Sequence, residues 1–501
     1  MPSIESDSPP LRVEIFRNVS KMLGAQVVQI PLQVIRALVI PKILSPETYG
    51  LWRSLFLITR YSSYLQMGTH QIMVKEMAYL AGKGEYGARK KICNNTFYYN
   101  LFASLFVGFC LILVSFFTKG EFSEFYRHGF RIVAFVVLAI NLWAFYFQLL
   151  RIEKEFTWLS VLTILTPVIN AGLAIGLLIY IQNVLVLAYA LAIANSIPLV
   201  LAIKKSGWPK FQEIQVIEMW RQIRVGFPLM LIPLMFMAIT GVDQVMIITF
   251  LKPEELGYYG VALSIQQLIY FIPGVLGSTL VPYLFEDFGR TDSALKSSHM
   301  FEKPTLIISL ACAFAVVGTC LFIHLPIKYY LTQYLPGLTV LYILLPGIFS
   351  VGLIMVAGNF IVISGKEKSI LRWQVVAVGL SIITNFAAIK LGYGIVGVAV
   401  ATFVTYFVYS TGILYIAFSL YIRNKTGVFK EICKLYVPLL YLFFFFVLIT
   451  QFIPNAAQSF VDDLQISCLR GVILMLTSIP LIVFYDSKLG VLATVKRTVG
   501  W

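Results

Sequence analysis

Polar and basic side chains interrupt two apolar stretches near the N-terminus, and they are the residues of this sequence with the clearest capacity for chemistry. They are Gln26, Gln29, Gln33 and Arg36 in the first stretch, and Arg53, Arg60 and Tyr64 in the second. At the helical spacing of about 100° per residue, the first set falls within about 80° of arc and the second within about 40°. Each helix would therefore carry one polar stripe, whose guanidinium groups could donate paired hydrogen bonds to a phosphate or carboxylate.

Arginine is a costly residue in the middle of a membrane-spanning helix, at about 2.5 to 3.5 kcal/mol for insertion. Arg60 lies about nine residues, or about 13 Å, from either end of its apolar window, so we expect it to face a hydrated cavity rather than lipid. Arg36 and Arg53 are nearer the ends of their windows and could instead extend to the lipid headgroups. The same extension is expected of Arg470, near the start of the last window. The stripes predict one wall of a cationic, hydrated cavity.

Asp243 is the carboxylate that lies well inside an apolar window. A buried acid of this kind is a candidate for binding a coupling proton or cation. The alternative is a structural role, in which Asp243 pairs with Gln244 or with an arginine across the cavity. Gln266 and Gln267, in the next window, could line the same cavity, although amides also bridge neighbouring helices for about 0.6 kcal/mol each.

The composition is that of a polytopic membrane protein. Of the 501 residues, 59% are hydrophobic and 13% are charged, whereas soluble proteins average about 25% charged residues. The first fifteen residues are polar and contain proline, so no cleaved signal peptide is expected. The net charge of +15 is explained by basic loops on one face of the membrane, and no nucleic-acid partner is predicted.

No motif indicates a cofactor, a metal site or the direct use of ATP. The six cysteines are scattered, without a C-x-x-C pair or a histidine at ligand spacing, so neither a disulfide framework nor a metal site is predicted. The phosphate-binding loop G-x-x-x-x-G-K-[ST] is absent. Because the connections between the apolar windows are too short for a soluble catalytic domain, we expect that the protein is not an enzyme.

About fourteen windows are long enough to cross the roughly 30 Å of bilayer hydrocarbon. They cover residues 22–44, 49–69, 95–117, 130–150, 158–180, 184–203, 226–250, 258–284, 304–324, 338–363, 372–391, 394–421, 435–453 and 466–484. An even number of spans places both termini on one face, and alternating the connections assigns most loop lysines and arginines to that face. By the positive-inside rule, this face and both termini are expected to be cytoplasmic.

A repeat relates the two halves of the chain. Residues 44–50 (LSPETYG), between the first two windows, recur as residues 251–257 (LKPEELG), between the seventh and eighth. Because six helices separate the copies, the halves are predicted to be parallel repeats related by an axis along the membrane normal. The predicted boundaries are a cytoplasmic segment 1–21, a six-helix bundle 22–203, a cytoplasmic linker 204–225, a second six-helix bundle 226–421, two additional helices within 435–484, and a cytoplasmic tail 485–501.

Two segments resemble a known family. Residues 40–51 (IPKILSPETYGL) resemble the first external turn of the polysaccharide transporter and O-antigen flippases (Wzx-type). Residues 241–251 (GVDQVMIITFL), followed by 255–259 (ELGYY), resemble the seventh-helix signature of the same family. This family belongs to the multidrug/oligosaccharidyl-lipid/polysaccharide exporter (MOP) superfamily, which also holds the MATE exporters and the lipid II flippase. Where the family often has a basic residue after the aspartate, this chain has Gln244.

The resemblance implies an all-α polytopic membrane protein with two six-helix bundles around a central cavity and two extra C-terminal helices. It implies a flippase that moves a polyprenyl-pyrophosphate-linked oligosaccharide, such as an O-antigen repeat unit, across the cytoplasmic membrane by alternating access with ion coupling. The cationic residues Arg36, Arg53 and Arg60 would bind the substrate. The cavity would also be lined by Gln26, Gln29, Gln33, Tyr64, Gln266 and Gln267, with Asp243 as the candidate site for the coupling ion.

The partners expected from this resemblance are the lipid-linked oligosaccharide, membrane lipid, a polysaccharide polymerase and glycosyltransferases. Two alternatives stay open. A MATE-like antiporter of cationic drugs would need carboxylates in the cavity, where the sequence offers Asp243. A membrane polymerase or ligase acting on lipid-linked glycans would be expected to carry a large external catalytic loop.

Overall fold

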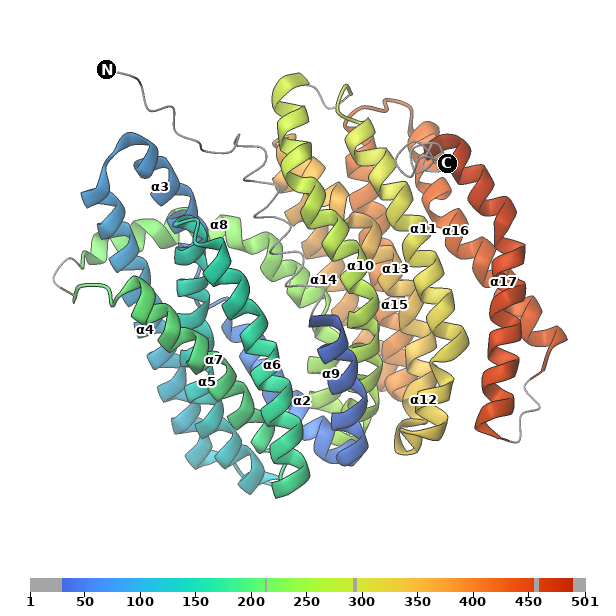
Figure 1. The fold of residues 1–501 in the computed structure, drawn as a ribbon, viewed down its shortest axis with the longest axis horizontal. Coiled ribbons are helices and arrows are strands. Elements are labelled where there is room, and N and C mark those ends of the chain that lie inside the picture. The colour runs from blue at the N-terminus through green and yellow to red at the C-terminus, as the bar shows by residue number, and fades with distance from the viewer. Residues whose placement is uncertain (1–28, 212–213, 292–294, 455–458, 490–501) are drawn as a thin grey trace, which may run out of the picture. The chain divides into compact units, whose positions relative to one another are not determined.

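The computed structural model describes residues 29–211, 214–291, 295–454 and 459–489 (Figure 1). Within these ranges every regular element is a helix and no β-strand occurs, which confirms the predicted all-α class. The predicted segment 1–21, Gln26 and residues 490–501 of the predicted tail lie outside the described residues. Eleven of the described helices are long and apolar enough to cross a membrane, judged by length and composition. The predicted count of about fourteen spans is therefore not confirmed.

The contacts within the chain define two compact units, Met1–Leu234 and Met235–Trp501. The first unit begins with a described helix over residues 29–43. It continues with α2 (Pro46–Ser62), α3 (Thr69–Lys83), α4 (Tyr86–Phe117), α5 (Ser123–Ile152), α6 (Phe156–Ile181), α7 (Val186–Ser206) and most of α8 (Val216–Ile239). A hydrophobic core lies where α5 packs against α4 and α7, with Phe97, Phe145 and Tyr146 buried and in edge-to-face contact.

The second unit contains the remaining helices. They are α9 (Val242–Phe250), α10 (Pro253–Thr291), α11 (His299–Phe322), α12 (His324–Tyr329), the 3-10 helix η2 (Thr332–Tyr334), α13 (Pro336–Ile363), α14 (Glu367–Lys390), α15 (Gly394–Ser419), α16 (Lys425–Phe452) and α17 (Phe460–Leu489). Helix α13 packs against α10, α11 and α15 and forms the centre of this unit. The buried rings of Phe301 and Phe360 stack there at 5.2 Å between centroids.

The two copies of the predicted repeat have the same local structure. The helix over residues 29–43 stops shortly before α2 begins at Pro46, and α9 stops shortly before α10 begins at Pro253. Proline suits the first position of a helix because its missing N–H would have no partner there. In the first copy the Ser45 hydroxyl also accepts a hydrogen bond from the Thr48 N–H at 3.3 Å, which caps α2.

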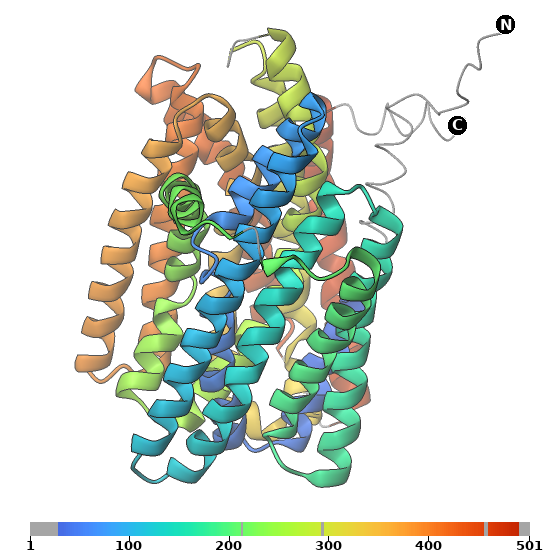
Figure 2. The ribbon, with the colours of Figure 1, turned by 90° about the vertical axis from the view of Figure 1, so that its left-hand side faces the viewer.

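The seventh predicted window, 226–250, is not one continuous helix. Helix α8 ends at Ile239, and α9 begins after Thr240 and Gly241. The Thr240 hydroxyl donates to the carbonyls of Phe236 and Met237 at 3.2 Å each, and such back-bonding competes with the helical ladder. Helix α8 also starts inside the predicted linker, and its first turns run across the direction of α4 and α5 (Figures 1 and 2).

Candidate functional site

The predicted arginine stripes lie in the first unit. Arg36 is in the helix over residues 29–43, Arg53 is in the middle of α2, and all three predicted arginines are half-buried. The mid-helix position predicted for Arg60 was wrong, because α2 ends at Ser62 and Arg60 belongs to its last turn. A cation in that turn is favoured by the negative end of the helix dipole, so Arg60 is less costly there than the sequence suggested.

The guanidinium group of Arg36 is partly buried, and it shares with that of Arg89 a buried Nε atom. Its Nε atom is buried and has no hydrogen-bond partner among the described residues. A buried N–H of a charged group normally has an acceptor, and leaving it without one costs free energy. An anion bound at Arg36 would supply this acceptor.

Of the neutral residues in the predicted stripes, Tyr64 forms a hydrogen bond within the first unit. Gln29 and Gln33 are half-buried in the same helix as Arg36. Tyr64 follows the end of α2, and its hydroxyl donates to the Pro233 carbonyl of α8 at 3.1 Å. Tyr64 thereby ties the end of α2 to α8 inside the first unit.

Asp243 is deeply buried in the second unit, in the first turn of α9, with 1% of its surface exposed. Its Oδ2 accepts a hydrogen bond from the Tyr259 hydroxyl at 2.6 Å, and its Oδ1 accepts one from the Gln244 backbone N–H at 2.7 Å. The Thr402 hydroxyl of α15 lies 3.4 Å from the Tyr259 hydroxyl. The carboxylate therefore lies at the positive end of the α9 dipole, and both of its oxygens accept hydrogen bonds.

The two predicted glutamines of α10 have different environments. Gln266 is buried inside the second unit, and its Oε1 has no hydrogen-bond partner among the described residues. Gln267 is exposed. Adjacent residues point about 100° apart on a helix, which lets one be buried while the other is exposed.

The repeat places several of these residues at equivalent positions. Arg36 stands ten residues before Pro46, and Asp243 stands ten residues before Pro253. By the same register, Arg60 corresponds to Gln267. The burial pattern supports this register, since the pairs Ile40 and Ile247, Trp52 and Tyr259, and Gly50 and Gly257 are all buried. Each unit thus carries a charged residue of opposite sign at the same point of its repeat.

A second buried carboxylate was missed from the sequence. Asp463 of α17 is fully buried and accepts hydrogen bonds from His324 Nε2 and Lys328 Nζ at 3.0 Å each, and from the Tyr329 hydroxyl at 3.1 Å. These contacts attach α17 to α12. No local pattern could have revealed them, because the partners are more than 130 residues apart in the chain.

The headgroup position predicted for Arg470 was wrong. Only 6% of Arg470 is exposed, and its Nε and Nη2 donate to the Ile453 carbonyl at 3.2 and 2.6 Å. This carbonyl follows the end of α16, where the last helical carbonyls have no intrahelical donor. Arg470 therefore caps α16 from α17 instead of extending to the membrane surface.

The family of this chain follows from a match that covers more than half of its length. The model of the family described as polysaccharide biosynthesis protein matches residues 15–288. The chain belongs to this family. The match includes both segments on which the resemblance to polysaccharide transporters rests, and that resemblance is confirmed. No curated protein matches the sequence.

Solved structures with a similar fold support the assignment of this polysaccharide biosynthesis protein to the MOP-type fold. The lipid II flippase MurJ in an inward closed conformation has a TM-score of 0.68 at 15% identity, over 93% of this chain and 100% of the other. An inward-facing multidrug resistance MATE family transporter of the MOP superfamily has a TM-score of 0.64 at 16% identity, over 81% and 99%. The Vibrio cholerae MATE transporter VcmN in the bent form has 0.56 at 13% identity, over 84% and 98%.

Proposed function

We propose that this protein is a flippase for a polyprenyl-pyrophosphate-linked oligosaccharide, an O-antigen or other surface polysaccharide repeat unit. Membership of the polysaccharide biosynthesis family and the MOP-type fold support this proposal. The observation that carries it is the buried Nε of Arg36, which has no acceptor among the described residues. A pyrophosphate group is a suitable acceptor, because its oxygens match the donors of a guanidinium fork.

In the proposed mechanism, the first unit recognises the anionic headgroup. Arg36, Arg53 and Arg60 bind the pyrophosphate, while Gln29 and Gln33 offer amides to the sugar hydroxyls. Gln26 and Tyr64, with Gln266, complete the proposed lining of the path. The polyprenyl tail stays in lipid, because about 0.8 kcal/mol is lost for each CH₂ transferred to water. The two six-helix bundles then alternate between inward and outward openings.

The second unit is proposed to supply the coupling. Asp243 would bind a proton or a sodium ion, and a change in its occupancy would alter its hydrogen bonds with Tyr259 and Gln244. Because Tyr259 belongs to α10 and lies beside Thr402 of α15, this change would reach two further helices. A ligand shifts a conformational equilibrium only through different affinities for the two states, and these contacts could provide that difference.

The proposed location is the cytoplasmic membrane, with both termini in the cytoplasm. On this topology the substrate arrives from cytoplasmic glycosyltransferases and leaves towards a polysaccharide polymerase at the outer face. These enzymes are the proposed partners, together with membrane lipid. No cofactor is needed for the proposed transport.

Flipping of a fluorescent lipid-linked oligosaccharide in vesicles tests the proposal directly. Arg36→Ala should weaken substrate binding by about 10- to 150-fold, the equivalent of one hydrogen bond to a charged group, while Arg36→Lys should retain part of the activity. Arg151→Ala is the matched control, since Arg151 is exposed at the end of α5. Normal activity per folded molecule of Arg36→Ala would contradict the proposed role of Arg36.

A second candidate function is export of cationic drugs in exchange for protons or sodium ions. The buried Asp243 and the likeness to MATE folds are the observations in its favour. Vesicles that accumulate a cationic dye on imposing a gradient, and show no movement of lipid-linked oligosaccharide, would support the antiporter. The three half-buried arginines favour the anionic substrate, because a cationic wall repels cationic drugs.

A further inference from the structure

The first turns of α8 expose an apolar face. Val216 is 76% exposed, Ile217 88% and Trp220 65%, and Phe227 is also exposed. At about 100° per residue, these four residues fall on one side of the helix within about 100° of arc. In a water-facing helix an exposed face with four large apolar side chains is unfavourable, and it indicates a surface that another apolar phase covers.

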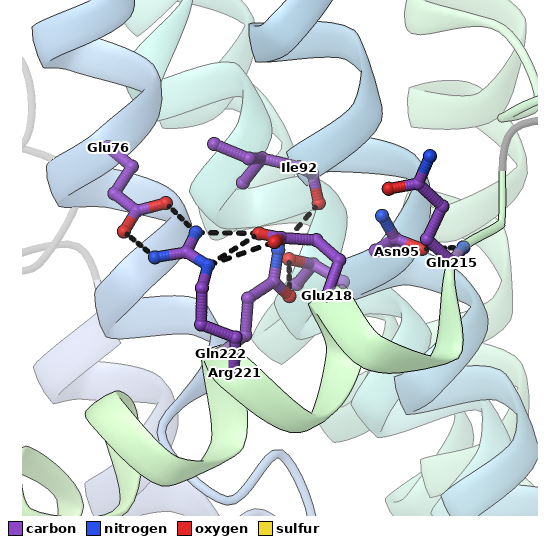
Figure 3. A network of polar contacts seen from close by, with 8 residues as sticks. Glu76, Ile92, Asn95, Gln215, Glu218, Arg221 and Gln222 are labelled. Carbon is purple, nitrogen blue, oxygen red and sulfur yellow. Dashed lines mark hydrogen bonds and ion pairs between the residues drawn. The ribbon is translucent and has the colours of Figure 1, made fainter.

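The opposite side of the same turns is attached to the first unit by polar contacts (Figure 3). Arg221 donates to both oxygens of Glu76 on α3 at 2.8 and 2.5 Å, and it also pairs with Glu218 one turn earlier at 2.6 to 3.0 Å. Gln222 is fully buried and joins Thr96 and Ile92 of α4 at 3.1 and 3.4 Å. The polar side therefore has its partners within the protein.

Close backbone contact between Gly68 and Gly226 fixes where α8 packs on the first unit. Gly68 has a φ of +83°, and a Cβ built on it would lie 2.0 Å from the carbonyl carbon of Gly226. Only glycine permits both the left-handed conformation and this contact. The apolar face is thus held outward by packing on the opposite side, so it cannot turn inward to bury itself.

Basic residues lie within the apolar face and shortly before it in the chain. Lys204, Lys210 and Arg224 are all exposed, and Arg224 lies on the same side of α8 as Trp220 and Ile217. The carboxylate of Glu218, in the same turns, is already paired with Arg221. The surface accordingly combines apolar side chains, a tryptophan and positive charge, which is the composition of helices that lie in the interface of anionic membranes.

We propose that this face of α8, formed by Val216, Ile217, Trp220 and Phe227 with Arg224 among them, docks on an anionic phospholipid leaflet, with Lys210 shortly before it in the chain. The first turns of α8 run across the direction of α4 and α5, as a helix lying flat at the end of a membrane-spanning bundle does (Figures 1 and 2). Each nearby basic residue adds electrostatic attraction to the leaflet. Arg221 and Gln222 attach the docked helix to α3 and α4 through their hydrogen bonds.

Site-directed fluorescence on the full chain tests the docking. A bimane probe at Ile217→Cys, in a variant without the native cysteines, is reconstituted in phosphatidylcholine vesicles with and without phosphatidylglycerol. We expect strong quenching by brominated lipid, little quenching by aqueous iodide, and deeper lipid quenching when phosphatidylglycerol is present. The control probe at Lys368→Cys, an exposed residue of α14, should show the reverse.

Removing these basic charges tests the anionic preference with the native cysteines in place. Lys210→Gln and Arg224→Gln should each weaken retention of phosphatidylglycerol by about fivefold, whereas Lys366→Gln and Lys368→Gln should not. Lipid quenching that is equal with and without phosphatidylglycerol would overturn the anionic preference. Iodide quenching of Ile217 as strong as that of Lys368 would overturn docking, and protection from both quenchers would show that protein covers the face instead.

Discussion

The two copies of the repeat turn share one backbone design and differ in charge. Both place proline at the start of the second helix and bury the equivalent glycines Gly50 and Gly257. At the equivalent point before the turn, the first unit has Arg36 and the second has Asp243. A shared frame thus carries a cation in one unit and an acid in the other, which suggests a division between anion binding and ion coupling.

The two charges have different environments, and the equivalent residues after the turn also differ. In the second unit, Tyr259 donates its hydroxyl to Asp243. Its equivalent in the first unit is Trp52, whose indole can donate a hydrogen bond but cannot accept one from a guanidinium. The acid is therefore satisfied within its own unit, while the Nε of Arg36 has no partner in the described part of the chain.

The largest effect is expected from neutralising the two charges separately. Asp243→Asn should abolish gradient-driven flipping and leave binding of the lipid-linked oligosaccharide nearly unchanged, because the amide cannot take up the coupling ion. Arg36→Gln should instead weaken binding by about 10- to 150-fold. Binding by fluorescence titration and flipping under an imposed gradient measure the two effects. Equal losses in both assays for both variants would break the proposed division between the units.

The hydroxyl of Tyr259 provides a second test, this time of stability. Tyr259→Phe removes a hydrogen bond to a buried carboxylate and should lower the free energy of unfolding by about 1.5 to 3 kcal/mol. In a chain that already carries Asp243→Asn, the same substitution should cost less, because the hydroxyl then loses a neutral partner rather than a carboxylate. Thermal unfolding in detergent compares the two backgrounds. An equal or larger loss in the Asp243→Asn background would contradict the contribution inferred for the bond between Tyr259 and Asp243.

A smaller effect is expected where the repeat pairs Arg60 with Gln267. Arg60→Gln gives the first unit the residue of the second, and should weaken substrate binding by about fivefold or less, since a partly exposed charge contributes up to about 1 kcal/mol. Gln267→Arg places a cation on an exposed position and should leave binding unchanged. Titration with the lipid-linked oligosaccharide checks both. If Arg60→Gln weakened binding as much as Arg36→Gln, the two arginines would contribute equally to substrate binding, contrary to this prediction.

The smallest effect is expected from a labelling experiment on the orientation of the two repeats, because its substitutions should leave activity intact. Ser45 and Lys252 occupy equivalent exposed positions, so cysteines introduced there should react at similar rates with an impermeant reagent added outside the cell. A cysteine at Ser369 should be protected on the predicted topology. Labelling of only one of the two repeat positions would show that the units are not parallel.

Several features were predictable from the sequence because they depend on local properties. The length of an apolar window, the proline of a turn and the spacing of a repeat involve residues close together in the chain. The order of the helices and the equivalence of residues 44–50 and 251–257 follow from these signals alone. Family membership rests on the same short motifs and on the match over residues 15–288.

The tertiary structure decided which polar side chains have partners. It separates Gln266 from Gln267, ends α2 two residues after Arg60, and divides the seventh window at Thr240 and Gly241. It also satisfies Arg470 with the carbonyl of Ile453 and leaves the Nε of Arg36 without an acceptor among the described residues. Hydropathy measures how a side chain partitions between water and lipid, whereas hydrogen bonding depends on atoms that only folding brings within 3 Å of one another.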